Sequence, residues 1–475
     1  MDAIVVGGGH NGLVCAAYLA RAGRRVLVLE RRAELGGAAV SERPFAGHDA
    51  RLSRYAYLVS LFPRRIADDL GVPLPLATRH VAAYAPPDLL LRTAPGGSWD
   101  AFAKLFSSLL APLPTAAQAR AVVGAQAWHD LVERPLGKTL RERFDDPLVR
   151  GVVGTDGLIG TFASLYGESL AQNRCFLWHV IGGAWRVPVG GMGALSSALA
   201  VAAREAGAEL RTGAEVVRVD GGEVTWVEDG VEHAASAKHV VANVAPAVLD
   251  RLRGREPRPS AEGCQTKVNL LLERLPRLRS GVAAEDAFAG TFRLNESEDE
   301  LEAAYAAAVR GELPDPAPAE LYCHSLTDPS IVPPGMHTLT LFGLHTPASL
   351  FTGDGVKHML ANRYLDALDE HLTEPIRDCV ARDAHGELCI EVKSPRDLER
   401  ELALPGGNIF HGELGWPWAD DGTAGTWGVE TDDERIVVCG AGAVRGGGVS
   451  GIGGHNAAMA ILEPRTSPSP PQGND

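Results

Sequence analysis

Three glycines near the N-terminus have the spacing that binds a dinucleotide. Gly7, Gly9 and Gly12 form a G-x-G-x-x-G turn, and Glu30 follows eighteen positions after Gly12. In such a turn the first glycine permits a tight bend, the second lets the backbone approach a pyrophosphate, and the third lets a helix pack on a strand. The helix N-terminus then faces the anion, and the acid is placed for ribose hydroxyls. These four residues therefore predict a dinucleotide site.

The elements around this turn are those of a βαβ unit. The apolar run 2–6 predicts a strand, the stretch 13–22 predicts a helix that Gly23 ends, and 26–29 predicts a second strand. A dinucleotide unit needs this order, with an acid at the end of the second strand. We therefore place the glycine turn at the edge of a parallel sheet.

Four further side chains lie close to the motif. His10 and Asn11 occupy variable positions inside the turn, and we expect them to contact the ligand together with the glycines. Arg31 and Arg32 would suit a ribose 2′-phosphate, but Glu30 would repel it. We therefore interpret the two arginines as solvated, with Arg31 at the edge of the cofactor site.

The residues after Glu30 resemble the extended FAD fingerprint of the amine oxidase and phytoene desaturase superfamily. Gly36 and Gly37 stand where that superfamily has a glycine pair, and simple NAD domains lack this extension. The amine oxidase branch usually has arginine after the pair, whereas this chain has Ala38, as in the desaturase-like branch. The resemblance implies that FAD is the cofactor, and Ala38 argues against an amine oxidase.

The resemblance continues in the middle of the chain. Residues 185–193 are similar to the family's W-x-x-P-x-G-G-M-G segment. A predicted helix at 194–206 and a predicted strand at 215–219 follow it. In the family, the backbone of that strand meets adenine at the position of Val216 or Val217, and we assign the contact to Val217.

The C-terminal glycines also match the phytoene desaturase-like branch. Segment 406–412 and segment 438–451 are most similar to the group named for its pyridine nucleotide-disulfide oxidoreductase domain. The resemblance implies that Gly442, Gly448 and Val449 lie beside the cofactor. Residues 446–449 lead into a helical pattern, and a helix N-terminus there would stabilise negative charge on the reduced flavin by roughly 0.3 to 2 kcal/mol.

The chain is long enough to bury large cores. It has 475 residues, of which 45% are hydrophobic and 22% charged, and this predicts two interleaved domains. We expect an α/β fold in which a Rossmann-like FAD-binding domain of the glutathione reductase type is interleaved with an α+β substrate domain carrying a helical lid. The FAD-binding pieces are 1–58, 186–262 and 404–462, the substrate pieces are 59–185 (the helical lid) and 263–403, and 463–475 is a disordered tail.

Periodicity predicts several elements of the substrate side. Helical patterns cover 99–110, 116–132 and 357–372, while strand patterns cover 266–272 and 337–344. We expect loops at 295–300, leading into a helix, and at the proline-rich segment 313–319.

Composition narrows the compartment and the partners. The net charge of −15 argues against nucleic acid and against attraction to anionic lipid. No apolar run approaches the roughly 18 residues of a spanning helix, and Asp2 directly precedes the first strand, leaving no room for a signal segment. We therefore predict a cytoplasmic protein, with peripheral membrane contact left open.

The cysteines and histidines do not have the spacing of a metal site or a redox disulfide. The seven cysteines form no C-x-x-C pair, which favours buried reduced thiols, and we predict no metal. Cys439 falls on a predicted strand and not at a typical flavin tether, so we predict non-covalent FAD.

Lys267 is the leading side-chain candidate for catalysis. In the strand 266–272, alternation puts Val268 and Leu270 on one face and Lys267 with Asn269 on the other. The segment resembles the strand on which amine oxidases carry a lysine that holds water near flavin N5. A surface lysine on a half-exposed strand is the alternative.

Two further sets of residues are candidates for the substrate pocket. His411 follows the glycine-rich stretch 406–410, and histidine can take or give protons near neutral pH; a polar loop is the alternative. Trp416, Trp418 and Trp427 are clustered, and aromatic walls suit an apolar substrate. Burial in the core without substrate contact is the alternative for the tryptophans.

The resemblance implies an FAD-dependent oxidoreductase that removes hydride from an apolar, carbon-rich substrate. The product would be desaturated or dehydrogenated, and with only one complete dinucleotide unit we expect oxygen, a quinone or another carrier as electron acceptor. Three alternatives remain: a flavin-dependent amine oxidase, an isomerase that uses reduced flavin without net redox change, and a lipid carrier similar to GDP-dissociation inhibitors. The carrier is disfavoured because a protein without FAD need not keep the glycines or Glu30.

Overall fold

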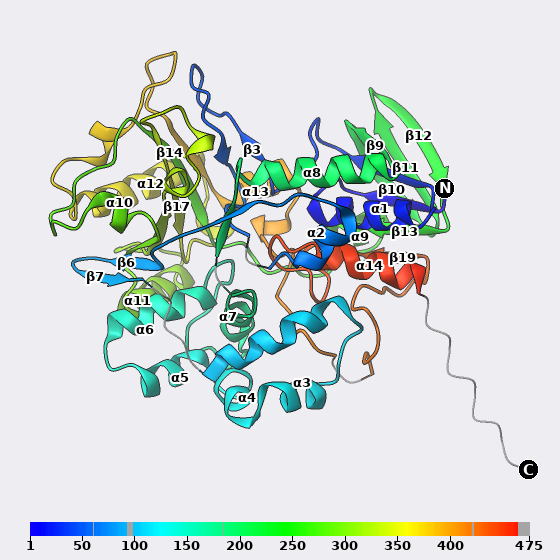
Figure 1. Ribbon diagram of the computed structural model, residues 1–475, viewed down its shortest axis with the longest axis horizontal. Coiled ribbons are helices and arrows are strands. Elements are labelled where there is room, and N and C mark those ends of the chain that lie inside the picture. The colour runs from blue at the N-terminus through cyan, green and yellow to red at the C-terminus, as the bar shows by residue number, and fades with distance from the viewer. Residues whose placement is uncertain (60, 93–97, 184, 420–421, 464–475) are drawn as a thin grey trace, which may run out of the picture.

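The structure is a computed structural model that describes residues 1–463 apart from 60, 93–97, 184 and 420–421 (Figure 1). Two β-sheets stand next to each other, and a group of helices lies below both in this view. Of the predicted tail 463–475, everything from 464 onward lies outside the described residues.

The first sheet is parallel and contains the predicted βαβ unit. Its strand order is β19-β13-β1-β2-β9, and every neighbouring pair is parallel. The strands come from three distant segments: β1 (Ala3–Val6), β2 (Val26–Glu30), β9 (Glu209–Thr212), β13 (His239–Ala242) and β19 (Ile436–Val438). The central strands β1 and β2 are buried along their whole length, which explains why they are continuous apolar runs in the sequence.

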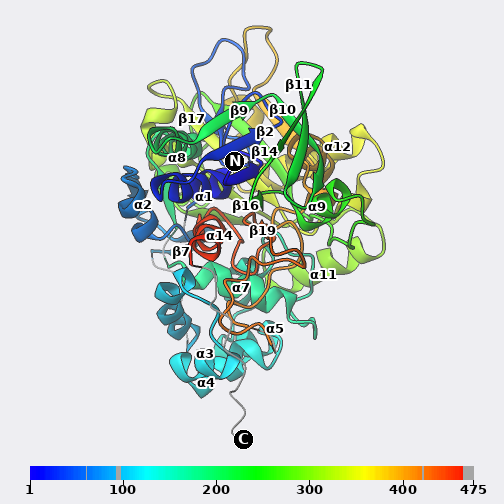
Figure 2. The same cartoon turned by 90° about the vertical axis from the view of Figure 1, so that its right-hand side faces the viewer.

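Alternate side chains of this sheet serve two different cores. Val5 and Val28 pack in the core that includes the helices, whereas Ile4 and Leu27 pack in a separate core with a small antiparallel sheet. Figures 1 and 2 both show the helices side by side. They are α1 (His10–Arg21), α8 (Met192–Glu205) and α14 (Ile452–Leu462), and on the other face lie β10 (Ala214–Asp220), β11 (Glu223–Glu228), β12 (Val231–Ser236) and α9 (Pro246–Leu252).

The second sheet is larger and mainly antiparallel. Its order is β18-β14-β17-β16-β15-β6-β7, with only the β15–β6 pair parallel. The strands are β6 (Ala83–Ala85), β7 (Leu89–Leu91), β14 (Thr266–Leu272), β15 (Thr291–Leu294), β16 (Ala319–Tyr322), β17 (His337–Gly343) and β18 (Ile390–Lys393). The predicted strand 266–272 coincides with β14, and 337–344 is one residue longer than β17.

Helices cover and flank this second sheet. The helix predicted at 357–372 is α12, which begins and ends three residues earlier and packs on the sheet through Leu360 and Leu365. A capping box between Ser297 and Glu300 starts α11 where the loop 295–300 was expected to lead into a helix. These helices are α10 (Ala284–Ala287), α11 (Glu298–Val309), α12 (Asp354–Asp369) and α13 (Pro395–Leu402).

The predicted helical lid, 59–185, differs from expectation in two ways. It contributes β6 and β7 to the second sheet, and β5 (Leu76–Thr78) pairs with β8 (Arg186–Pro188). The single helix predicted at 116–132 is two helices, because Gly124 adopts a φ of 89° that ends the first. The helices of this segment are α2 (Arg64–Leu70), η1 (Ser98–Leu110), α3 (Ala116–Val123), α4 (Ala125–Val132), α5 (Leu136–Arg143), α6 (Pro147–Gly154), η2 (Thr155–Gly157) and α7 (Ala171–Ile181).

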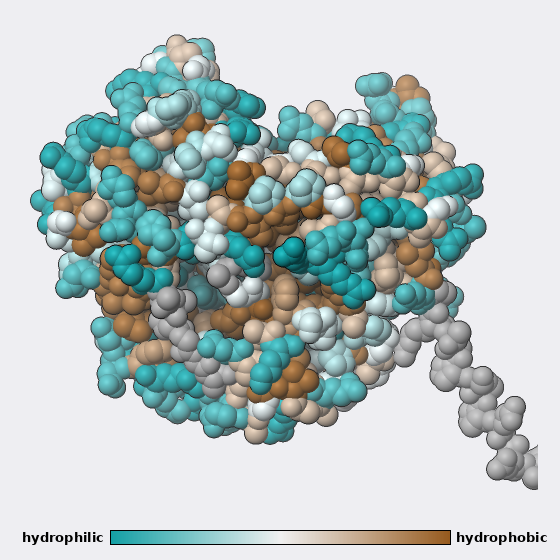
Figure 3. All heavy atoms as spheres, viewed as in Figure 1, coloured by the Kyte–Doolittle hydropathy of each residue, from teal (hydrophilic) through white to brown (hydrophobic). Residues whose placement is uncertain are grey.

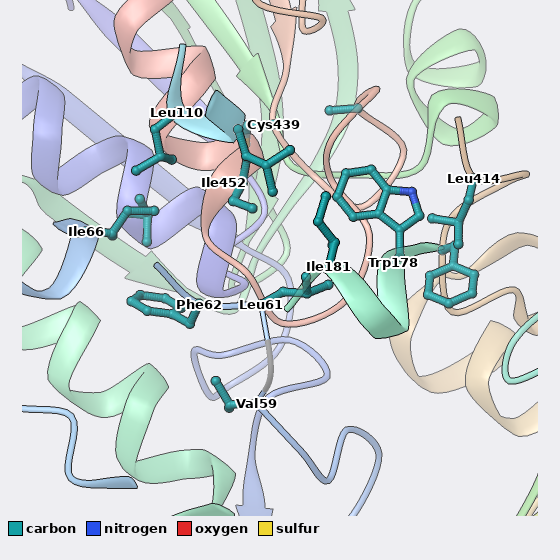
Figure 4. Close-up of a cluster of buried hydrophobic side chains, with 14 of the residues drawn as sticks. Val59, Leu61, Phe62, Ile66, Leu110, Trp178, Ile181, Leu414, Cys439 and Ile452 are labelled. Carbon is teal, nitrogen blue, oxygen red and sulfur yellow. The ribbon is translucent and has the colours of Figure 1, made fainter. Parts of the chain in front are cut away.

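One hydrophobic cluster joins these helices to the first sheet. Figure 4 shows Ile66 of α2, Leu110 of η1 and Trp178 of α7 gathered around Ile452 of α14 and Cys439 after β19. All five side chains are buried. The cluster therefore fixes α7 relative to the C-terminal glycine segment.

The surface is mostly hydrophilic on the face shown in Figure 3, where hydrophobic side chains form separate groups. Exposed large hydrophobic residues are scattered over different elements, for example Val122 on α3, Val201 on α8 and Met359 on α12. Among the described residues, no helix has both the length and the apolar character needed to cross a bilayer.

Two buried histidines are expected to make the fold sensitive to acid. Burial lowers the pKa of His324 and of His345 to about 3 each. The unfolded chain therefore binds more protons than the folded one once the pH falls below about 6.5. Each histidine should cost up to about 1.4 kcal/mol of unfolding free energy per pH unit below that value.

Urea unfolding over a pH series measures this loss. His345 has a φ of 54°, which asparagine tolerates, so His345→Asn should make the acid dependence shallower. His385→Gln, at an exposed position, should leave it unchanged. Equal acid slopes in all three proteins would contradict the role of His345.

Candidate active site

A cavity of about 420 Å³ runs from the glycine turn of the first sheet to the second sheet. At one end Gly7, Gly9 and Glu30 line it, and at the other end Lys267 of β14 and Phe342 of β17 do so. The parallel strands β1 and β2 end at this cavity, which is where ligands bind in open α/β sheets.

The glycine turn is held by a residue that the motif does not include. The side-chain amide of Asn243 donates to the Gly7 carbonyl oxygen at 3.0 Å. A Cβ on Gly9 would lie 2.9 Å from Asn243 Nδ2, and a Cβ on Gly12 would lie 2.4 Å from the Gly7 oxygen. Gly7 and Gly9 line the cavity, while Gly12 packs the helix against the turn.

The N-terminus of α1 has the features of an anion site. The helix begins at His10, three residues earlier than predicted, and Gly9 at the N-cap position offers no side chain to cap it. Its first amides therefore remain available for a ligand. His10 and Asn11 line the cavity, and His10 Nε2 and Asn11 Oδ1 are buried without a hydrogen-bond partner among the described residues. This donor and acceptor set fits the diphosphate of FAD.

Glu30 is fixed at the end of β2. Its carboxylate accepts from the backbone amides of Gly8 at 2.7 Å and Arg32 at 2.8 Å, and the residue lines the cavity. Arg31 is exposed at the rim and donates to the Glu401 carbonyl oxygen at 2.7 Å. The acid is thus oriented by its own turn, as a ribose-binding group must be.

Of the glycine pair and the residue after it, Gly37 and Ala38 line the cavity, whereas Gly36 does not. The Gly36 amide donates to the Gly8 carbonyl oxygen at 2.9 Å. Its φ of 119° and the 2.9 Å from a built Cβ to Val40 Cγ1 leave room for glycine alone. Gly36 therefore braces the turn, which corrects its prediction as a direct contact.

Two further predicted cofactor contacts are displaced by one residue. Val216 lines the cavity, whereas Val217 is 45% exposed because a β-bulge between Val216 and Arg218 turns it outward. Ala441 lines the cavity in place of Gly442, where a Cβ would lie 2.5 Å from Pro246 Cδ.

The predicted C-terminal contacts Gly448 and Val449 line the cavity. The helix that follows is α14, but it starts at Ile452, after Gly451 with a φ of 68°. Residues 446–451 therefore form an irregular segment between the cavity and the helix.

Lys267 is 3% exposed, so the surface-lysine alternative is wrong. Its ammonium donates to the carbonyl oxygens of Ser53 and Tyr55, the latter at 2.7 Å, and lies 5.3 Å from the centre of the Tyr57 ring. The segment carrying these residues covers the face of β14 that alternation left polar. Burial lowers the pKa of Lys267 to about 7, which places a titratable amine on the cavity wall.

His411 lines the cavity, but its surroundings favour the neutral imidazole. Burial lowers its pKa to about 4, and His10 nearby contributes to that lowering. His411 Nδ1 is buried without a partner among the described residues. A neutral ring with an unpaired nitrogen fits a hydrogen bond to a bound ligand better than acid catalysis.

The three predicted pocket tryptophans lie in the core. Trp416 and Trp418 stack with their ring centres 5.0 Å apart, and Trp418 meets Trp128 at 4.7 Å. Trp427 packs edge-on against His455. None of the three predicted tryptophans is among the residues that line the cavity, so their prediction as substrate contacts is wrong.

Other aromatic residues form the wall instead. They are Tyr55, Tyr57, Trp178, Trp185, Phe342 and Phe410. They come from distant chain segments that no sequence motif connects. Only Trp185 stood in a recognisable motif, and nothing in that motif indicated contact with a substrate.

Within the described residues, no group of three or more His, Cys, Asp or Glu side chains is arranged to hold a metal ion. All seven cysteines are buried and unpaired.

Comparison with known proteins supports this site. Residues 5–67 match a NAD(P)-binding Rossmann-like domain, and residues 86–382 match the flavin containing amine oxidoreductase family. An uncharacterised protein of Mycobacterium tuberculosis is 48% identical over 518 residues, covering 97% of each chain. Pyridine nucleotide-disulfide oxidoreductase domain-containing protein 2 of Mus musculus is 29% identical over 561 residues, covering 97% of this chain and 93% of the relative.

Solved structures share the fold. Putrescine oxidase bound to putrescine has a TM-score of 0.58 at 18% identity, covering 97% of this chain and 98% of the other. Because residues 86–382 span more than half of the sequence, the chain belongs to the flavin containing amine oxidoreductase family and is an oxidoreductase with FAD as its cofactor.

Proposed function

We propose that this enzyme dehydrogenates a largely apolar, carbon-rich substrate. The observation that carries the proposal is the aromatic and apolar wall beyond the glycine turn, where Trp178, Trp185 and Phe342 face the same cavity as Lys267. Such a wall binds apolar surface and excludes water from the reacting centre. FAD, when bound, supplies the hydride acceptor.

The charges of the cavity favour an uncharged substrate over an ammonium ion. Among the described residues that line it, the carboxylates are Glu30 and Glu215, which lie at the end of β2 and on β10, toward the dinucleotide end. Beside the aromatic wall stand Lys267 and His179, and both become cationic when they take up a proton. An ammonium group would therefore find no anionic partner there.

The names of three relatives support the same substrate class. A phytoene dehydrogenase of Streptomyces griseus is 29% identical over 299 residues, covering 54% of this chain. Shorter matches, covering 15% and 8% of this chain, join it to a component of the limonene dehydrogenase of Castellaniella defragrans and to all-trans-retinol 13,14-reductase of Macaca fascicularis. These names supply the test compounds.

The experiment is anaerobic bleaching of the bound flavin. Phytoene, limonene and all-trans-retinol are compared with putrescine and cyclohexylamine as hydride donors. We expect bleaching by at least one of the three apolar compounds and by neither amine. Bleaching by the amines alone would overturn the proposal in favour of an amine oxidase.

A matched pair of tryptophan variants ties the result to the cavity. Trp185→Ala removes part of the wall and should weaken binding of the active compound about tenfold or more, since it removes a large aromatic contact. Trp418→Ala removes a tryptophan of the core and should lower stability without changing that binding constant. Equal binding in the two variants would contradict the assignment of the wall.

For reoxidation we propose oxygen, a quinone or another carrier, because the chain contains a single complete dinucleotide unit. A peripheral contact with a membrane would give access to quinone and to apolar substrates.

The cofactor is expected to be held without a covalent bond. Cys439 follows β19, is fully buried and is absent from the cavity lining, and burial raises the pKa of its thiol well above the usual value. A thiol of this kind does not form the thiolate that a tether requires. Acid precipitation should therefore release all the flavin as FAD into the supernatant, and flavin that stays with the pellet would contradict this prediction.

A further inference from the structure

A buried group of charged side chains lies behind the aromatic wall. Arg293 is on β15, Glu296 follows that strand, and Glu320 and Tyr322 are on β16. Glu296 is 1% exposed and Glu320 is 0% exposed. Buried carboxylates are costly, so their partners decide their charge state.

Hydrogen bonds give the two acids different roles. Arg293 Nη1 donates to Glu320 Oε1 and, at 3.1 Å, to Glu296 Oε2. The Tyr322 hydroxyl donates to Glu320 Oε2. Glu320 therefore accepts at both oxygens, as an ionised carboxylate does. Glu296 Oε1 has no partner among the described residues, so this oxygen is the place for a proton.

The charge balance requires a proton in this pair. Burial raises the pKa of Glu296 well above its usual value and also raises that of Glu320, while Arg293 lowers both. One guanidinium cannot neutralise two buried carboxylates at this separation. The resting state therefore has Glu296 protonated and Glu320 ionised, with an affinity for protons above that of an exposed glutamate.

Tyr57 connects Glu320 to the cavity. Tyr57 lines the cavity, and its ring centre is 4.8 Å from that of Tyr322. A side-chain hydrogen bond joins the two tyrosines. Tyr57, Tyr322 and Glu320 thus form a continuous array from the cavity wall to a buried carboxylate.

We propose that the Tyr57–Tyr322–Glu320 array is a proton relay that takes up the proton released when the substrate is dehydrogenated. This inference rests on the proposed function. One C–H bond of the substrate leaves with its electron pair as hydride to oxidised FAD. The neighbouring C–H bond gives its proton to Tyr57, and the electrons of that bond form the new double bond. Tyr57 passes its own proton to Tyr322, and Tyr322 passes its proton to Glu320.

Other charged and titratable groups face the array and set the proton affinity of Glu320. The Arg79 guanidinium lies 5.9 Å from the centre of the Tyr322 ring, and His324 stacks on that ring with the two centres also 5.9 Å apart. The groups that act on Glu320, on the tyrosines or on His324 are Arg293, Glu296, Asp156, His179, Arg79, His324 and Lys267. The cations among them keep Glu320 ionised at rest.

The first test needs no turnover. Infrared difference spectra of the holoenzyme between mildly alkaline and mildly acidic pH report protonation of buried carboxyl groups. We expect a carboxylic acid band that is lost in Glu320→Gln, shifted in Tyr322→Phe and shifted less in Tyr57→Phe. Tyr364→Phe is the control, because the Tyr364 hydroxyl is buried without a partner among the described residues. A spectrum in which Glu320→Gln removes no band overturns the proposal.

The second test follows flavin reduction by whichever of phytoene, limonene or retinol bleaches the enzyme. Glu320→Gln should slow reduction roughly 10²-fold, the usual contribution of a general base. The wild-type rate should fall as the pH drops through the pKa of Glu320, because the protonated acid cannot accept a proton. The Glu320→Gln rate should lose that pH dependence, whereas a merely structural role would lower the rate and keep it.

The two arms separate failure of the relay from failure of the proposed function. The infrared arm decides the relay even if none of the three compounds bleaches the flavin, and that result would count against the proposed substrate class alone. Normal reduction rates and an unchanged pH profile in Glu320→Gln would overturn the relay and leave the dehydrogenase proposal standing.

Discussion

Gly9→Val is expected to fold but to purify without FAD. Gly9 lines the cavity at the N-terminus of α1, and its backbone conformation is open to other residues, with φ −70° and ψ 168°. The side chain itself causes the damage: its Cβ would lie 2.9 Å from Asn243 Nδ2, and its methyl groups would fill the space where a pyrophosphate meets the backbone.

The ratio of flavin to protein absorbance measures the loss, and circular dichroism confirms that the variant is folded. Gly355→Ala is the matched control, because a Cβ at Gly355 meets nothing within 4 Å. Full flavin occupancy in Gly9→Val would show that the turn does not hold the cofactor.

Lys267→Met is expected to slow reaction of the reduced enzyme with oxygen or quinone roughly 10²-fold, the effect of removing one positioned electrostatic group. The lysine is buried on the cavity wall, and two of its three N–H donors are used by the carbonyl oxygens of Ser53 and Tyr55. The third remains for water or cofactor. The same change leaves two carbonyl groups unpaired and should cost about 1 to 3 kcal/mol of stability.

Stopped-flow mixing of dithionite-reduced enzyme with oxygenated or quinone-containing buffer measures the rate without any substrate. Lys393→Met is the control: Lys393 lies opposite Lys267 on β18 and pairs with Glu401 at 2.6 Å outside the cavity lining. Flavin reduction by an active compound should change less than reoxidation. Wild-type rates in both half-reactions would remove Lys267 from the site and leave it a purely structural residue.

Local spacing predicted the parts of the site that one chain segment builds. Gly7, Gly9 and Glu30 act within a single strand, turn and helix, so their order in the sequence carries their geometry. The same holds for β14, whose seven residues were predicted from alternation alone. The burial of Lys267 was not predictable in this way, because the cover over its face is the distant segment that carries Ser53 and Tyr55.

The aromatic wall and the buried acids required the tertiary structure. Tyr57, Trp178 and Phe342 meet only because α7 and β17 converge on one cavity. The tryptophans that are close in sequence, Trp416 and Trp418, pack on each other and on Trp128 instead. Clustering along the chain therefore indicated a core here and not a binding surface.

Single residues of unusual conformation account for the remaining differences. The positive φ of Gly124 divides a helix that periodicity alone continues. A β-bulge next to Val217 moves the cavity contact to Val216. Neither feature leaves a periodic signal, since each changes the direction of the chain at one position.

The mass of the product from a single turnover tests the central claim most directly. The enzyme is mixed without oxygen with whichever of phytoene, limonene or retinol bleaches its flavin, and the organic material is extracted and analysed by mass spectrometry. A dehydrogenase yields a product lighter by two hydrogen atoms, in an amount equal to the flavin that was bleached. An isomer of unchanged mass, or a carbonyl product formed from an amine alone, would contradict the account.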